Sequence, residues 1–228
     1  MGEVRDMREW NALRSYPQPE ERVIPTRTIR ERIVASYRGK DFFDGPRSCG
    51  YGGYKHDNRW AAVREDIIAD YALEAWSRVI QFGSEKGYLL AELASQGIKV
   101  TGIEASSYAR RHSMVKDNIK TAFPVTELTN PYDLAIAIGV VYTLNLADAM
   151  NMIRQLERIA HKAFVTLAAY DAEEDLKLFR KWTLLGTTIL RKDDWREVLN
   201  HCGYTGDYWF VTAETLNLKD TLRLKDSS

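Results

Sequence analysis

The chain has 228 residues, and its 32 lysines and arginines equal its 32 aspartates and glutamates in number, so the formal net charge is zero. This length suffices for one α/β domain with a large core, whereas the balanced charge provides no field to attract nucleic acid or an anionic membrane, and we expect neither partner. The two cysteines, Cys49 and Cys202, do not form a C-x-x-C pair, which argues against a disulfide framework or a metal site and favours a cytoplasmic protein.

The N-terminal region is predicted to be an arm followed by a short helix. Residues 1–25 contain three prolines and many charges, so we expect no secretory leader there, but an arm that lies on the domain or is partly mobile. Residues 26–37 have apolar side chains at helical spacing. We therefore divide the chain into an N-terminal arm and helix, residues 1–43, and a main domain, residues 44–228, which begins with a glycine-rich lid loop at 44–60.

From Trp60 onward the chain alternates between helical and strand patterns. Apolar residues from Trp60 to Tyr71 recur at the spacing of an amphipathic helix, and strands and helices then follow in turn. Such alternation predicts a mostly parallel sheet covered by helices on both faces, with the last strand antiparallel at or near one edge. The expected strands are 79–82, 99–103, 133–138, 163–168 and 207–213, and the later helices are 87–96, 107–118, 146–161, 172–184 and 193–202.

The first strand leads into a glycine turn that is typical of nucleotide-like cofactor sites. The stretch RVIQFGSEKGYLLAEL places Gly83 and Gly87 between a buried strand and a helix, whose N-terminal amides face the strand end. Glu104 follows 21 residues after Gly83, at the tip of the second strand, where a carboxylate can accept hydrogen bonds from a ribose diol. A dinucleotide and S-adenosylmethionine both suit this geometry, and a tight turn without a ligand is the plain alternative.

Glu85 favours S-adenosylmethionine over a dinucleotide. A carboxylate about 4 Å from a pyrophosphate would be repelled by several kcal/mol, even at an effective dielectric constant near 20. The same carboxylate would attract the cationic amino-acid part of S-adenosylmethionine. A dinucleotide oxidoreductase is therefore the weaker interpretation.

Three stretches together resemble the class I S-adenosylmethionine-dependent methyltransferases, in particular small bacterial members with a GYGGY leader. These stretches are GYGGYKHDNRW at 50–60, the glycine turn with VTGIEAS, and the tail WREVLNHCGYTGDYWF. The resemblance covers residues 51–210 and implies a Rossmann-like fold. It also implies methyl transfer to oxygen or nitrogen of a small molecule, such as a saccharide or a nucleotide-linked sugar.

The cofactor motif departs from the family pattern. Gln81 stands where an acid is usual, and Glu85 replaces a glycine, so we interpret Glu85 as supplying the charge that Gln81 lacks. The acid that often binds adenine is also hard to find in residues 119–125. A catalytically degenerate binding or assembly subunit, as a homodimer or beside a related subunit, is the second interpretation.

The resemblance, together with the side-chain chemistry of the loop and of the segments after the strands, indicates roles for individual residues. The loop and the strand ends supply candidate cofactor, substrate and catalytic groups, with His56 as the first candidate base for a hydroxyl acceptor. The expected cofactor contacts are Tyr51, Gly83, Ser84, Glu85, Gly87, Glu104, Ala105, Ile138 and Gly139; the expected substrate contacts are Tyr54, Asp57, Arg59, Asn145 and Trp182; the candidate catalytic residues are His56 and Tyr142.

Overall fold

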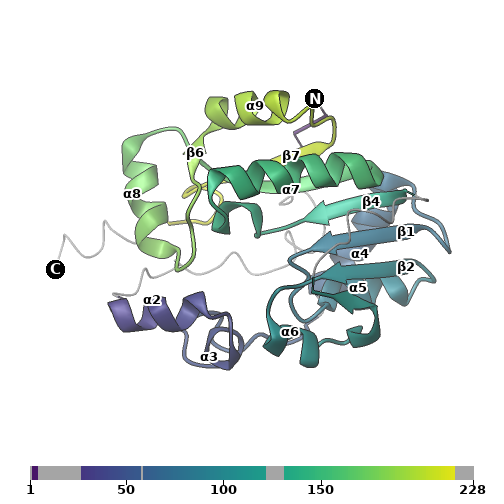
Figure 1. Cartoon of the computed structure of the whole chain (residues 1–228), viewed down its shortest axis with the longest axis horizontal. Coiled ribbons are helices and arrows are strands. Elements are labelled where there is room, and N and C mark those ends of the chain that lie inside the picture. Colours follow the sequence, from purple (N-terminus) through teal and green to yellow (C-terminus); the bar gives the residue numbers. More distant parts are fainter. Residues whose placement is uncertain (1, 5–26, 58, 122–130, 219–228) are drawn as a thin grey trace.

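A computed structural model describes residues 2–4, 27–57, 59–121 and 131–218 of the chain (Figure 1). Its centre is a seven-stranded sheet in which the strands follow the order β3-β2-β1-β4-β5-β6, with β7 also paired to β5. The strands are β1 Arg78–Phe82, β2 Lys99–Ile103, β3 Ile119–Lys120, β4 Tyr132–Ala137, β5 Ala160–Tyr170, β6 Leu190–Arg191 and β7 Asp207–Val211.

The direction of the last strand differs from the prediction. Strand β7 runs parallel to β5, with Phe164 opposite Asp207 and Ala168 opposite Val211, so the expected antiparallel strand at 207–213 is wrong. Helix α9, Lys192–His201, precedes β7 and returns the chain to the starting end of the sheet, and such a crossover yields a parallel neighbour. Every strand pairing in the described part of the sheet is parallel.

Helices cover both faces of the sheet, as predicted. Helix α4, Arg59–Tyr71, and α5, Tyr88–Ala94, pack on one face, while α7, Leu146–Ile159, and α9 pack on the other (Figure 1). Because successive side chains of a strand point to opposite faces, Ile80 of β1 joins the α7 and α9 side and Val79 the α4 and α5 side. The Rossmann-like fold class is therefore confirmed.

The expected helix at 107–118 is broken into two pieces. Helix α6 spans only Ser107–Arg111, and a 3₁₀ turn, η2, follows at Lys116–Asn118. Between them the Ser113 hydroxyl accepts a hydrogen bond from the backbone N–H of Val115 at 3.1 Å, a local bond that competes with helical pairing. The prediction of one continuous helix is therefore wrong.

Two N-terminal helices lie beside the end of the sheet at which the strands finish. Helix α2, Ile29–Ser36, begins with a capping box between Thr28 and Glu31, and α3, Lys40–Phe43, follows it. Phe42 and Phe43 pack with Ala109 of α6, so these helices sit below the sheet on the side of α6 and α8, Glu173–Trp182 (Figure 1). A further 3₁₀ turn, η3, spans Val141–Thr143 after β4.

Residues 2–4 lie against the edge of the sheet. The backbone N–H of Tyr208 in β7 donates to the carbonyl of Glu3 at 3.1 Å, and Val4 forms a parallel bridge with Tyr208. The rest of the arm predicted at 1–25 lies outside the described residues, as do residues 122–125 of the segment considered for an adenine-binding acid. Among the described helices, none combines the length and the apolar character needed to cross a membrane.

Candidate functional site

The glycine turn has the backbone shape that its sequence requires. Gly83, Glu85 and Gly87 all have positive φ values, of 65°, 52° and 70°. A Cβ atom added to Gly83 would come within 2.8 Å of the Val140 Cβ atom, which follows β4. The turn therefore needs glycine at position 83 for both its φ angle and its close approach to the next strand end.

Glu104 holds this turn from the end of β2. It is 2% exposed, and its two carboxylate oxygens accept hydrogen bonds from the backbone N–H groups of Glu85, at 2.9 Å, and Ser106, at 2.7 Å. Ala105, the other predicted ribose contact, is exposed. The carboxylate thus joins the ends of β1 and β2 in addition to any contact it makes with a ligand.

Glu85 has partners that the sequence did not indicate. The Tyr51 hydroxyl donates to its Oε1 atom at 2.5 Å, and the Arg38 guanidinium lies 3.6 Å from the same atom. Burial raises the pKa of Glu85, while Arg38 and the hydroxyls of Tyr51 and Tyr54 oppose that rise. Because Arg38 compensates its charge, this carboxylate selects less strongly against a pyrophosphate than the sequence pattern predicts for an isolated carboxylate.

The loop before α4 is fixed onto the glycine turn. Lys86, which is buried, donates to both carboxylate oxygens of Asp44, at 2.6 and 2.8 Å, and to the carbonyl oxygen of Tyr54 at 2.9 Å. The Tyr54 ring stacks between Tyr51, with centroids 4.5 Å apart, and Tyr88, at 4.9 Å. The loop therefore covers the turn with aromatic rings and with an ion pair whose lysine is buried.

Two buried polar atoms at the turn have no hydrogen-bond partner within the described part of the chain. They are Oε1 of Gln81, at the end of β1, and Oγ of Ser84. Buried acceptors without partners are costly, by about 1–3 kcal/mol each. They suit a ligand that carries hydrogen-bond donors at the end of β1.

A pocket opens beside the turn, beyond the end of β4. Its open volume, including the mouth, is about 510 Å³. Tyr51 and Gly139, two of the predicted cofactor residues, and Tyr142 and Trp182 line it, so the structure brings these four together. The remaining lining residues are Arg27, Arg38, Phe42, Arg47, Gly50, Thr143, Thr183, Leu184 and Leu185.

Secondary structure positions the residues at the pocket floor. The backbone N–H of Gly139, whose φ is 71°, donates to the Thr166 hydroxyl of β5 at 2.8 Å, and half-buried Ile138 precedes it. The Tyr142 ring meets Phe179 of α8 edge to face, at 6.0 Å between centroids. Burial raises the pKa of Tyr142, so its hydroxyl stays protonated at neutral pH.

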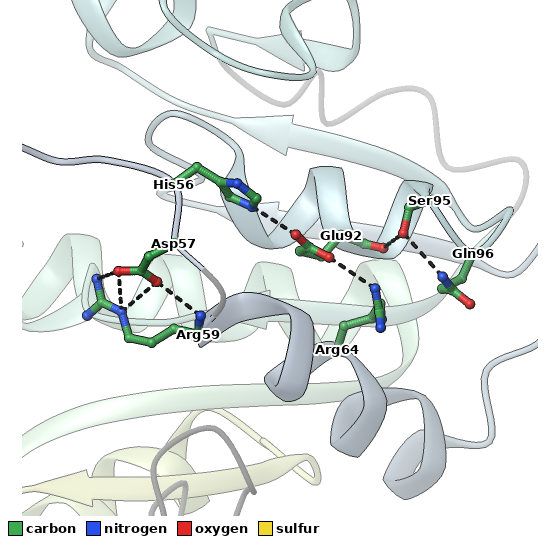
Figure 2. Close-up of polar contacts among 7 residues, drawn as sticks. All are labelled: His56, Asp57, Arg59, Arg64, Glu92, Ser95 and Gln96. Carbon is green, nitrogen blue, oxygen red and sulfur yellow. Dashed lines mark hydrogen bonds and ion pairs between the residues drawn. The ribbon is translucent and has the colours of Figure 1, made fainter. Parts of the chain in front are cut away.

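His56, Asp57 and Arg59 are engaged elsewhere (Figure 2). The His56 Nε2 atom lies 2.8 Å from Oε1 of Glu92 in α5, and Arg64 of α4 donates to the other oxygen of Glu92 at 3.0 Å. Asp57 pairs with Arg59 next to it, at 2.8 Å between Oδ2 and Nη2. None of these three predicted site residues lines the pocket described above.

Asn145 is another predicted substrate contact with a structural partner. Its side chain caps α7 by accepting from the backbone N–H of Asp148 at 3.0 Å. Sequence reasoning missed Arg27 and Arg38, which come from the segment before residue 44, and Arg47, which lies in the glycine-rich loop itself. No motif marks these arginines, because only the packing of α2 and α3 over the strand ends brings them to the pocket.

A sequence model of the methyltransferase-domain family matches residues 54–217, which is most of the chain. The chain belongs to this methyltransferase family. Membership confirms the predicted class and the expectation of an enzyme, and supports S-adenosylmethionine as the cofactor. A search of curated proteins finds no match.

Within the described ranges, no cluster of three or more His, Cys, Asp or Glu residues could hold a metal ion.

Solved structures of methyltransferases have the same fold. Magnesium protoporphyrin IX methyltransferase from Synechocystis PCC 6803, crystallised with bound SAM, is 21% identical to the present chain, with a TM-score of 0.51. The match covers 78% of the present chain and 88% of the Synechocystis chain. A Bacillus halodurans C-125 protein provisionally named a methyltransferase is 12% identical with a TM-score of 0.50, over 61% and 68% of the two chains. Identities this low establish the fold alone.

Proposed function

We propose that this chain transfers a methyl group from S-adenosylmethionine to oxygen or nitrogen of a small acceptor, such as a saccharide or a nucleotide-linked sugar. One observation supports this most strongly. The glycine turn, at the carboxyl ends of β1 and β2, lies next to a pocket at the end of β4, and the two share Tyr51, which lines the pocket and bonds Glu85 of the turn. In parallel α/β sheets, ligands bind at this end of the strands.

The residues of the turn suit S-adenosylmethionine. The Gln81 oxygen without a partner and the Glu85 carboxylate are acceptors for an ammonium group, and the absence of a Cβ at Gly83 keeps the turn close to β4. Glu104 holds the turn and has lone pairs left for ribose hydroxyls. When bound, the cofactor supplies a methyl group on an activated sulfonium.

The pocket residues would orient the acceptor rather than take its proton. Methyl transfer depends mainly on alignment of the two reacting atoms at about 3–3.5 Å. Since Tyr142 stays protonated, its hydroxyl is a hydrogen-bond donor to the acceptor and not a general base. His56 is bonded to Glu92 outside this pocket, so it is a poor candidate for the base. An acceptor whose nucleophilic atom needs no base fits this pocket best.

Calorimetric titration with S-adenosylhomocysteine tests the cofactor assignment. We expect the wild-type protein to bind it, and Glu85→Gln to bind about tenfold more weakly if the carboxylate contributes to ammonium binding. Equal affinity of Glu85→Gln and wild type would remove Glu85 from the cofactor site. As an independent check, S-adenosylhomocysteine at about 100 times its Kd should stabilise the fold by about 2.7 kcal/mol, whereas NAD should not.

A catalytically degenerate binding or assembly subunit is the second candidate, and one observation favours it. Glu85 is already bonded to Tyr51 and lies 3.6 Å from Arg38, so the protein's own groups occupy the carboxylate that we assign to the cofactor. This alternative predicts that neither S-adenosylmethionine nor S-adenosylhomocysteine binds to the folded protein. Transfer of a labelled methyl group from S-adenosylmethionine to any compound in a small-molecule library would exclude it.

For the remaining properties we propose a cytoplasmic protein of small-molecule biosynthesis, with a main domain at 44–228 in which the loop 44–60 acts as a lid. The same proposal allows a homodimer or a complex with a related subunit. Sedimentation of the purified protein at several concentrations would distinguish these assemblies from a monomer. The lid role predicts that S-adenosylhomocysteine protects the loop against proteolysis, since the loop covers the glycine turn.

A further inference from the structure

The described lining of the pocket beyond β4 contains three arginines and no aspartate or glutamate. The three come from separate places: Arg27 precedes α2, Arg38 follows α2, and Arg47 lies in the loop after α3. Arg38 has a counter-charge, since its guanidinium lies 3.6 Å from Glu85. Arg27 and Arg47 therefore carry the positive charge of the pocket that no ion pair among the described residues neutralises.

Arg27 is held at the pocket wall, and none of the ion pairs among the described residues includes it. One of its terminal nitrogens donates to the carbonyl oxygen of Trp182, and within the described chain its Nε atom is buried with no hydrogen-bond partner. Burial lowers the pKa of Arg27, and the nearby Arg47 and Arg32 lower it further, whereas the smaller effect of Glu31 raises it. The surroundings of this guanidinium thus carry an excess of like charge, which a bound anion would relieve.

Arg47 faces the same pocket from the glycine-rich loop. Its Nη1 atom donates to the carbonyl oxygens of Gly50, at 2.9 Å, and Tyr51, at 3.2 Å. No ion pair of Arg47 occurs among the described residues, and the side chain is exposed. A guanidinium has five N–H donors in a planar fork, so Arg47 retains donors that match a carboxylate or a phosphate.

The other walls of the pocket suit a ring or another apolar body next to that anion. Phe42, Tyr142 and Trp182 supply aromatic surface, and Leu184 and Leu185 add aliphatic surface. Aromatic and apolar walls with a few polar groups among them are typical of small-molecule sites. The chemistry required is thus an anionic group at one end and a flat or apolar part beside it.

We propose that this pocket binds a methyl acceptor that carries a carboxylate or phosphate, with Arg27 and Arg47 holding the anionic group and the aromatic walls holding the rest. The inference rests on the proposed function, because it assigns the acceptor side of the same site. Such an acceptor binds next to the glycine turn, with Tyr51 between the two sites. Specificity then comes from charge, which a neutral molecule of the same shape lacks.

Calorimetric titrations with benzoate, phenyl phosphate and neutral benzamide test the proposal, each performed with and without S-adenosylhomocysteine. We expect at least one anion to bind at least about tenfold more tightly than benzamide, and its affinity to fall as salt is added. Preference for benzoate would assign a carboxylate, and preference for phenyl phosphate a phosphate. Equal binding of all three, or no binding of either anion, would overturn the proposal.

Variants locate the anion. Arg27→Gln and Arg47→Gln should each weaken binding of the preferred anion about tenfold, while Arg30→Gln, at an exposed arginine on α2, should leave it unchanged. Arg27→Lys keeps a positive charge and should retain more affinity than Arg27→Gln, which separates loss of charge from loss of folding. Unchanged anion affinity in both glutamine variants would contradict the assignment.

The two proposals fail separately. If S-adenosylhomocysteine binds and the anions do not, the anionic acceptor is wrong and the methyltransferase assignment stands. If an anion binds through Arg27 and Arg47 and S-adenosylhomocysteine does not, the anion site stands and the proposed function is wrong.

Discussion

Glu85 shows at the scale of one residue how neighbours decide what a side chain does. Its φ of 52° is uncommon for a residue with a side chain, and Glu104 accepts the hydrogen bond of its backbone N–H. Its carboxylate accepts a hydrogen bond from Tyr51 of the loop before α4 and lies 3.6 Å from the guanidinium of Arg38, which follows α2. The sequence pattern predicted a free charge beside a cofactor, whereas in the fold Glu85 belongs to a partly buried network.

The network makes stability depend on pH in a defined direction. Burial raises the pKa of Glu85 above its ordinary value of 4.5, so the folded protein keeps the proton over a pH range in which the unfolded chain has lost it. The resulting stabilisation is complete below about pH 4.5 and is lost as the pH rises through the folded pKa. We expect the free energy of unfolding of wild type minus that of Glu85→Gln to fall as the pH rises.

Urea denaturation from about pH 4 to about pH 8 measures this difference. Glu174→Gln, at an exposed position on α8, is the matched control for loss of a carboxylate. A difference between wild type and Glu85→Gln that grows with pH would mean that Arg38 and the tyrosines outweigh burial.

At the scale of elements, caps and crossovers matter more than periodicity. Helix α7 starts where its Asn145 cap satisfies the backbone N–H of Asp148, and α6 stops where Ser113 bonds the backbone of Val115. The two-residue strands β3 and β6 could not be predicted from the sequence, because two residues are too few to show an alternating pattern. Strand β7 is parallel because α9 brings the chain back across the sheet before it.

The cap of α7 leads to a prediction that competes with a substrate role for Asn145. Asn145→Ala should lower the free energy of unfolding by about 1 kcal/mol, because the Asp148 N–H loses its acceptor. Asn145→Ser can still cap the helix and should recover most of that loss. Chemical denaturation of wild type and the two variants measures these free energies of unfolding. An alanine variant as stable as wild type would mean that the Asn145 cap does not stabilise the fold.

At the scale of the whole molecule, burial on both faces of one sheet sets the stability. Trp195 of α9 is 0% exposed, and its Nε1 atom donates to the carbonyl oxygen of Ala168 in β5 at 2.7 Å. Trp195→Phe removes that donor and leaves a small cavity, so we expect a loss of about 2–4 kcal/mol. Trp76→Phe is the control, since Trp76 is 73% exposed and should cost less than about 1 kcal/mol.

Calorimetric melting or urea unfolding compares these two tryptophan variants. Similar losses in both would mean that burial on the α9 side does not dominate stability. A loss confined to Trp195→Phe would tie the docking of α9, and with it the parallel placement of β7, to the core.

The amino-acid sequence by itself determined the alternation of strands and helices, the glycine turn and the methyltransferase class. These features are local in the sequence: they depend on the periodicity of apolar residues, on glycine at positive φ and on the sequence separation of Gly83 and Glu104. Tertiary structure decided the direction of β7 and the partners of Glu85. It also decided that His56 bonds Glu92 instead of lining the pocket, and that three arginines line one pocket. Those outcomes depend on contacts between residues far apart in the chain, and packing, not sequence spacing, determines which side chains meet.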